Sequence, residues 1–163
     1  MTPDPAQRRA LFAHPAGWIA LGFGSGLSPR APGTIGSLAA LLPWLALREL
    51  PLPLYALVVA AAFALGVWAC DWAVRVSRND DPGFVVWDEF VGQWLAATPL
   101  LWSPHGGYGL LAAFVLFRLF DVLKPWPVSL VDRRVQGGFG VMLDDAIAGL
   151  LAAIVLALAL AIR

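Results

Sequence analysis

The sequence predicts an all-α integral membrane protein, a helical bundle of about five spans with a re-entrant or interfacial N-terminal segment. Two observations predict this class. The 163 residues are 60% hydrophobic and 13% charged, with a mean hydropathy of +0.74, whereas an average soluble domain is about 45–50% apolar and about 25% charged. Two stretches of seventeen residues, 54–70 and 146–162, carry no charge. Each approaches the length that crosses about 30 Å of hydrocarbon.

Net charge and cysteine content exclude two further classes. The formal net charge is zero and no run of Lys or Arg forms a basic arm, so no nucleic-acid partner is expected. The single cysteine, Cys70, lies in an apolar stretch, which excludes a disulfide framework and favours a buried thiol. No internal repeat divides the chain, so we interpret residues 1–163 as one membrane domain.

The other elements follow from breaks in the apolar pattern. Residues 11–27 are rich in Gly and Pro, which predicts an interfacial or re-entrant segment rather than a span. The apolar stretch 35–47 is short and precedes a Pro-Leu-Pro turn, so it spans with its flanks or tilts. The 28 uncharged residues between Glu89 and Arg118 are interrupted by SPHGGYG at 103–109, which predicts a helical hairpin with its turn there.

Charges are distributed unequally over the two faces of such a bundle. With five crossings and a cytoplasmic N-terminus, nine of the eleven Lys and Arg residues fall on the cytoplasmic side, as the positive-inside rule expects. Ten of the eleven carboxylates fall on the same side, with Glu49 alone opposite, although that rule does not concern acids. This gathering predicts a functional site at the cytoplasmic face.

Three charged motifs lie at helix ends on that face. They are VVWDEFVGQW with Asp88 and Glu89, FRLFDVLKPWP with Arg118, Asp121 and Lys124, and VDRRVQGGFGVMLDDAIAG with a glycine-rich loop at 137–140 followed by Asp144 and Asp145.

Each motif has a structural alternative to function. Acids at a helix N-terminus complement the macrodipole, and the three-residue spacing of the second motif places its charges on one helix face, as in an ion-pair ladder. Two adjacent carboxylates among apolar residues favour function for Asp88 and Glu89, whereas the two interpretations of the second motif stay equally open. Asp145, Gly149 and Ala153 form a stripe, which predicts tight packing with Asp145 in the bundle interior.

Carboxylates from three helix ends suit a hard divalent cation. Mg²⁺ is commonly bound by one or two carboxylates together with water and substrate phosphate oxygens. The only histidines, His14 and His105, lie in different segments, so we expect turn or interface residues rather than metal ligands. Residues 21–40 lack the Lys of a Walker loop but offer backbone N–H groups, hydroxyls and Arg30 to an anion. A flexible connector is the equal alternative for this glycine-rich segment.

The segments GFGSGLSPRAPGTIGSLAA, VVWDEFVGQW, FRLFDVLKPWP and DRRVQGGFGVMLDDAIAG, in this order, resemble phosphatidylglycerophosphatase A over about residues 20–150. The resemblance implies an enzyme of the bacterial inner membrane. Together with the spans and charge distribution above, it leads us to expect a multi-pass protein with its active site facing the cytoplasm. The resemblance also implies hydrolysis of phosphatidylglycerophosphate to phosphatidylglycerol and phosphate with Mg²⁺. The matching acidic positions are Asp88, Glu89, Asp121, Asp144 and Asp145, with Arg118, Lys124 and Arg133 as basic companions.

From these positions we expect the five acids to serve as metal ligands and catalytic groups. The expected phosphate-binding residues are Ser25, Arg30, Thr34, Ser37, Arg118, Lys124 and Arg133. Two mechanisms stay open, attack on phosphorus by a water that the metal activates and a carboxylate orients, and an aspartyl-phosphate intermediate on Asp88 or Asp144.

Two other function classes compete with the enzyme. Intramembrane carboxylates and a broken helix near 22–36 would suit an ion-coupled membrane transporter, although the acids gather at one face and no paired repeat is present. A non-catalytic membrane assembly subunit would use the Trp and Gly residues for packing alone. Membrane lipids are expected partners in every case, and Gly- and Ala-rich helix faces leave a homo-oligomer open.

Overall fold

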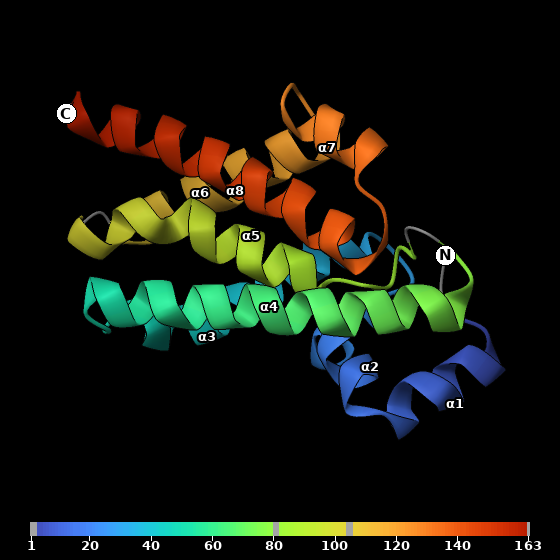
Figure 1. Ribbon diagram of the computed structural model, residues 1–163. Helices are drawn as coiled ribbons and strands as arrows, with labels where there is room; N and C mark the ends of the chain where they lie inside the picture. Colours follow the sequence, from blue (N-terminus) through green and yellow to red (C-terminus); the bar gives the residue numbers. More distant parts are fainter. Residues whose placement is uncertain (1–2, 80–81, 104–105, 163) are drawn as a thin grey trace.

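The computed structural model describes residues 3–79, 82–103 and 106–162 (Figure 1). Within these residues the secondary structure is helical and contains no strand, which confirms the all-α prediction. The elements in chain order are α1 (Pro5–Ala13), α2 (Pro15–Ala20), the 3₁₀ segment η1 (Gly22–Leu27), α3 (Pro32–Leu47), α4 (Leu52–Ser77), α5 (Trp87–Ala97), the 3₁₀ segment η2 (Thr98–Trp102), α6 (Gly106–Leu123), α7 (Val128–Arg134) and α8 (Gly137–Ala161).

The last helix, α8, lies at the centre of the packing and contacts α4, α5 and α6. Glycines allow the backbone of α8 to approach the backbone of α5 closely. A Cβ added at Gly149 would lie 2.3 Å from the carbonyl oxygen of Gly92 on α5, so only glycine permits this distance between the two backbones. Asp145 lies one turn before Gly149 and is 4% exposed. Gly149 therefore packs as closely as predicted, and Asp145 lies in the interior.

The N-terminal segment packs against α4. Gln7 Nε2 donates to the carbonyl oxygen of Ser77 at 3.3 Å, and the ring of His14 stacks on Trp72 with a centroid distance of 4.6 Å. His14 Nδ1 also accepts from the N–H of Ala16 and caps α2, which confirms a turn residue. Residues 11–27 form short helices and a 3₁₀ turn instead of a long helix. His105 lies outside the described residues.

Two helices of the described chain, α4 and α8, are long and apolar enough to cross a membrane, and α3 is a shorter apolar helix. The prediction of five spans remains a prediction. Cys70 on α4 is fully buried, as expected.

Three boundaries differ from the sequence prediction. The glycines at 137–140 begin α8 instead of forming a loop. A Cβ at Gly138 would lie 2.2 Å from the backbone nitrogen of Asp71, so close packing on α4 outweighs the low helix propensity of glycine. Similarly, α6 already begins at Gly106, inside the expected 103–109 turn, and Gly109 is buried. Helix α3 begins at Pro32, three residues before Ile35, because proline is well suited to the first helical position.

Candidate active site

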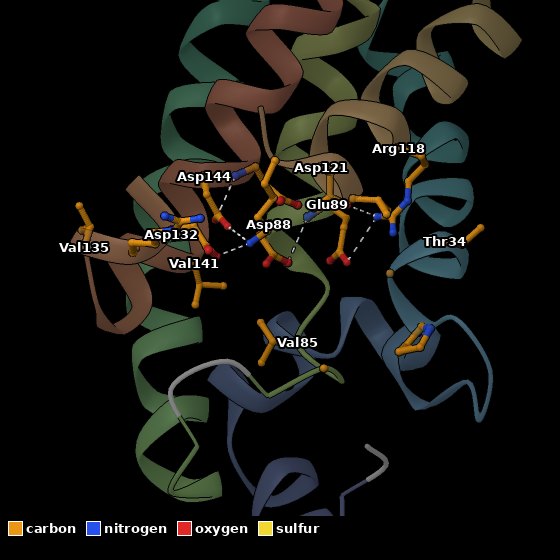
Figure 2. Close-up of a pocket in the computed structure, with 18 of the residues that line it drawn as sticks. Thr34, Val85, Asp88, Glu89, Arg118, Asp121, Asp132, Val135, Val141 and Asp144 are labelled. Carbon is orange, nitrogen blue, oxygen red and sulfur yellow. Dashed lines mark hydrogen bonds and ion pairs between the residues drawn. The ribbon is translucent and has the colours of Figure 1, made fainter. Parts of the chain in front are cut away.

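A cavity of about 660 Å³ opens among the start of α3, the start of α5, the end of α6, α7 and the first half of α8 (Figure 2). The five acids predicted from the sequence all line it. Among the described residues, its lining includes six carboxylates and three cations, namely Asp88, Glu89, Asp121, Asp132, Asp144, Asp145, Arg118, Lys124 and Arg133.

Asp88 and Glu89 lie in the first turn of α5, and apolar anchors fix their position. Trp87 is buried, and its Nε1 donates to the carbonyl oxygen of Ala62 on α4 at 3.0 Å. The N–H of Glu89 donates to Asp88 Oδ1 at 3.1 Å. Acids in a first turn also complement the helix dipole, so the local sequence holds both carboxylates at this end of the bundle.

Asp144 and Asp145 lie about two turns into α8 and face different partners. Neighbouring helical residues differ by about 100° in direction. Asp144 Oδ2 accepts from Lys124 Nζ at 2.7 Å, whereas Asp145 approaches Asp88 and Glu89. The N–H of Asp145 donates to Asp144 Oδ1 at 3.1 Å. The two adjacent aspartates therefore belong to two different clusters.

Asp88, Glu89 and Asp145 form a carboxylate triad. One oxygen from each lies within 4.8 Å of the others. Glu89 Oε2 and Asp145 Oδ2 are buried and have no hydrogen-bond partner within the described chain. Unpaired buried charge is strongly unfavourable, and a divalent cation would both compensate it and find the hard oxygen ligands it prefers. These residues therefore fit a bound Mg²⁺.

Arg118 lies between Glu89 of the triad and residues of α6 and α3. Its Nη1 lies 2.5 Å from Asp121 Oδ2 and 3.8 Å from Glu89 Oε1. The same nitrogen donates to Ser37 Oγ at 3.4 Å, and Ser37 Oγ donates to the carbonyl oxygen of Gly33 at 2.9 Å. A Cβ at Gly33 would lie 2.2 Å from Glu89 Oε1. Glycine at this position therefore lets α3 approach the ion pair closely.

Lys124 departs from the predicted ladder. Helix α6 ends at Leu123, and Lys124 has a left-handed backbone with φ of 43° just before Pro125. Its ammonium consequently bonds Asp132 on α7 and Asp144 on α8. The predicted pair between Arg118 and Asp121 forms. The prediction that Lys124 lies on the same helix face was wrong. Burial alone would lower the pKa of Lys124, but its hydrogen bonds to the two aspartates raise that pKa above its usual range.

Comparison with known proteins assigns the family. The model of the family described as phosphatidylglycerophosphatase A matches residues 18–160. The chain belongs to this family. It is 44% identical over 151 residues to phosphatidylglycerophosphatase A of Escherichia coli K12, covering 92% of this chain and 86% of that protein. It is 41% identical over 159 residues to the Haemophilus influenzae Rd protein of the same name, covering 95% and 94%.

A third relative carries a different name. A Bacteroides thetaiotaomicron protein, provisionally named a phosphatidylinositol-3-phosphatase, is 44% identical over 149 residues, covering 86% of this chain and 91% of that protein. No solved structure matched the chain. Membership of the phosphatidylglycerophosphatase A family identifies the protein as a phosphatase.

The basic and hydroxyl residues predicted for phosphate binding in this phosphatase separate into two groups. Thr34, Arg118, Lys124 and Arg133 line the cavity. Among described residues, Ser25, Arg30 and Ser37 do not line it. Ser25 Oγ donates to the nearby carbonyl oxygen of Gly22 at 2.9 Å, and Arg30 is exposed in the loop before α3. Ser37 contacts the lining residues Arg118 and Gly33 through its hydroxyl.

Sequence reasoning missed two contributors to the site. Asp132 was passed over because an acid beside Arg133 and Arg134 on a polar stretch resembles an ordinary surface charge. Gly33 was noted only as part of a glycine-rich composition, which gives no signal for contact with Glu89.

Proposed function

We propose that the protein is a Mg²⁺-dependent phosphatidylglycerophosphatase of the bacterial cytoplasmic (inner) membrane, with its active site at the cytoplasmic face. One observation carries this proposal: a carboxylate triad, in which Glu89 Oε2 and Asp145 Oδ2 are buried without a hydrogen-bond partner among the described residues, lies in a cavity that also contains cations. The names of the Escherichia coli and Haemophilus influenzae relatives support the substrate. Neither a transporter nor an assembly subunit gains comparable support.

The charge balance of the cavity supports a metal requirement. Six carboxylates face three cations among the described residues that line the cavity, and this negative excess would repel a phosphate group unless further positive charge were present. Asp88, Glu89 and Asp145 would hold Mg²⁺. When bound, the ion would neutralise phosphate oxygens and make phosphorus more susceptible to attack.

The protein's own residues prepare the site for the phosphoryl group. Ser37 and Asp121 hold the Arg118 guanidinium beside Glu89, where its remaining N–H groups can donate to phosphate oxygens. Both oxygens of Asp144 already accept hydrogen bonds, from Lys124 and from the N–H of Asp145. This arrangement makes Asp144 a poor nucleophile. Because Asp88 would serve as a metal ligand, we propose attack by a carboxylate-oriented water and not by an aspartate.

The surface of the bundle supports the membrane location. Large apolar side chains are exposed along four helices, as follows: Leu38, Leu42 and Leu45 on α3, Leu54, Leu57 and Leu65 on α4, Leu111, Val115 and Leu119 on α6, and Leu150, Ile154 and Leu158 on α8. Exposed apolar surface on this scale is unusual for a soluble monomer but normal in contact with lipid. The positive-inside distribution then directs the cavity to the cytoplasm.

Phosphate release from phosphatidylglycerophosphate in detergent micelles tests the proposal. We expect release by the purified protein, loss of release with EDTA and recovery with added Mg²⁺. Asp88→Asn and Asp145→Asn should each lower kcat/KM by about a thousandfold, because loss of a metal ligand removes several kcal/mol of charge stabilisation.

Glu49→Gln is the matched control, since Glu49 is exposed, pairs with Arg48 and does not belong to the described lining of the cavity. It should retain wild-type activity. Full activity in both aspartate variants would contradict the site assignment. A wild-type protein that moved ions across liposomes without releasing phosphate would instead indicate the transporter.

A further inference from the structure

The three cations of the cavity are not equally available to a ligand. Arg118 is held by Asp121 and Glu89, and Lys124 is held by Asp132 and Asp144. Arg133 makes no ion pair with any described residue. Among the described residues that line the cavity, it is therefore the one cation whose charge is not already balanced by a carboxylate.

Arg133 also differs from the triad in depth. Asp88 and Asp145 are 8% and 4% exposed, whereas Arg133 is an exposed residue of α7. Its neighbours Asp132 and Val135 lie on one side of the acids, and Thr34 and Arg118 lie on the other (Figure 2). The cavity thus has buried acids in its interior. At its mouth, on the α7 side, lies the guanidinium of Arg133, which makes no ion pair with a described residue.

The proposed substrate carries two phosphate groups of different chemistry. The terminal phosphomonoester is the group that is hydrolysed, while the phosphodiester, three carbons away, joins the glycerol headgroup to the lipid and remains in the product. Both are anions, and a guanidinium offers paired N–H donors that match phosphate oxygens. A phosphomonoester that reaches the buried triad would leave the phosphodiester nearer the mouth.

We propose that Arg133 forms a second anion subsite that binds the phosphodiester of the lipid substrate and so selects lipids with two phosphate groups over lipids with one. This inference rests on the proposed function. Arg133 recognises the part of the substrate that does not react, whereas Arg118 faces the reacting phosphate and Lys124 holds Asp132 and Asp144.

Kinetics of Arg133→Ala with two lipids test the subsite. Phosphatidylglycerophosphate carries both phosphates, and phosphatidate carries only the phosphomonoester. We expect kcat/KM for phosphatidylglycerophosphate to fall by about ten- to a hundredfold, as for loss of a charge-assisted hydrogen bond, with phosphatidate hydrolysis unchanged. Arg134→Ala is the matched control, because Arg134 is also exposed on α7 but does not line the cavity.

A soluble inhibitor pair provides the same comparison without a membrane surface. Propane-1,3-diol bisphosphate has two phosphates at the substrate's spacing, and propyl phosphate has one. Wild type should bind the bisphosphate more tightly, and Arg133→Ala should lose that preference.

Equal losses on both lipids, equal effects of Arg133→Ala and Arg134→Ala, or an unchanged inhibitor preference would each overturn the subsite. Failure of the proposed function would look different, since wild type would then release no phosphate from phosphatidylglycerophosphate.

Discussion

Two groups of carboxylates share one cavity and differ in what balances their charge. Asp132 and Asp144 accept hydrogen bonds from Lys124, while the triad of Asp88, Glu89 and Asp145 retains buried oxygens without a partner among described residues. In the first group both carboxylates pair with a cation of the protein. In the second, Arg118 lies 3.8 Å from Glu89 Oε1, and we infer that an external cation compensates the oxygens that have no partner.

This difference separates structural acids from ligand-binding acids. Asp144 and Asp145 are adjacent in sequence and on the same helix, yet only Asp145 joins the triad. We infer that buried oxygens without a partner, rather than residue type or position along the chain, mark the carboxylates that would bind Mg²⁺. We infer that Asp121 and Asp144 position the site, held by Arg118 and Lys124 respectively.

Among changes to the first group, Asp132 and Asp144, we expect Lys124→Met to have the largest effect. Asp132 and Asp144 would then face each other without a cation, and we expect a loss of about 1–2 kcal/mol of stability, discounted for the partial exposure of Asp132. Thermal melting in detergent measures this loss. Lys124→Met/Asp132→Asn should recover part of it, because one of the two like charges is removed. Wild-type melting of the single variant would contradict a structural role for Lys124.

A smaller effect is expected from Ser37→Ala, which removes the hydroxyl that accepts from Arg118 Nη1. Loss of one such hydrogen bond is worth about 1 kcal/mol, so kcat/KM should fall about fivefold while metal affinity is unchanged. Ser25→Ala is the matched control, since Ser25 Oγ bonds the carbonyl oxygen of Gly22 outside the cavity. Equal activity of the two variants would show that Arg118 needs no support from α3.

The acidic pairs were predictable because they are adjacent charges within apolar sequence, and helical periodicity correctly directed Asp145 inward. The partners of Lys124 were not predictable. Its left-handed backbone conformation ends the helix and turns the ammonium toward α7 and α8, and this depends on where those helices pack. The composition of the glycine-rich segment 21–40 suggested anion binding. It could not show that the Ser25 hydroxyl already donates a hydrogen bond to the carbonyl oxygen of Gly22.

The start of helix α8 was not predicted because it also depends on contacts between distant parts of the chain. Local propensity disfavours helix at Gly137 and Gly138, but contact with Asp71 and α4 stabilises it there. Such long-range contacts are absent from any local sequence pattern.

Metal binding by Asp144→Asn and Asp145→Asn shows whether Asp145, and not its neighbour Asp144, is a metal ligand. Binding of Mn²⁺ as a spectroscopic substitute for Mg²⁺ can be followed by electron paramagnetic resonance in wild type, Asp144→Asn and Asp145→Asn. We expect Asp144→Asn to bind Mn²⁺ nearly as wild type does and Asp145→Asn to lose about a hundredfold or more in affinity. Retention of wild-type affinity by Asp145→Asn, with loss in Asp144→Asn, would contradict this assignment of the ligand.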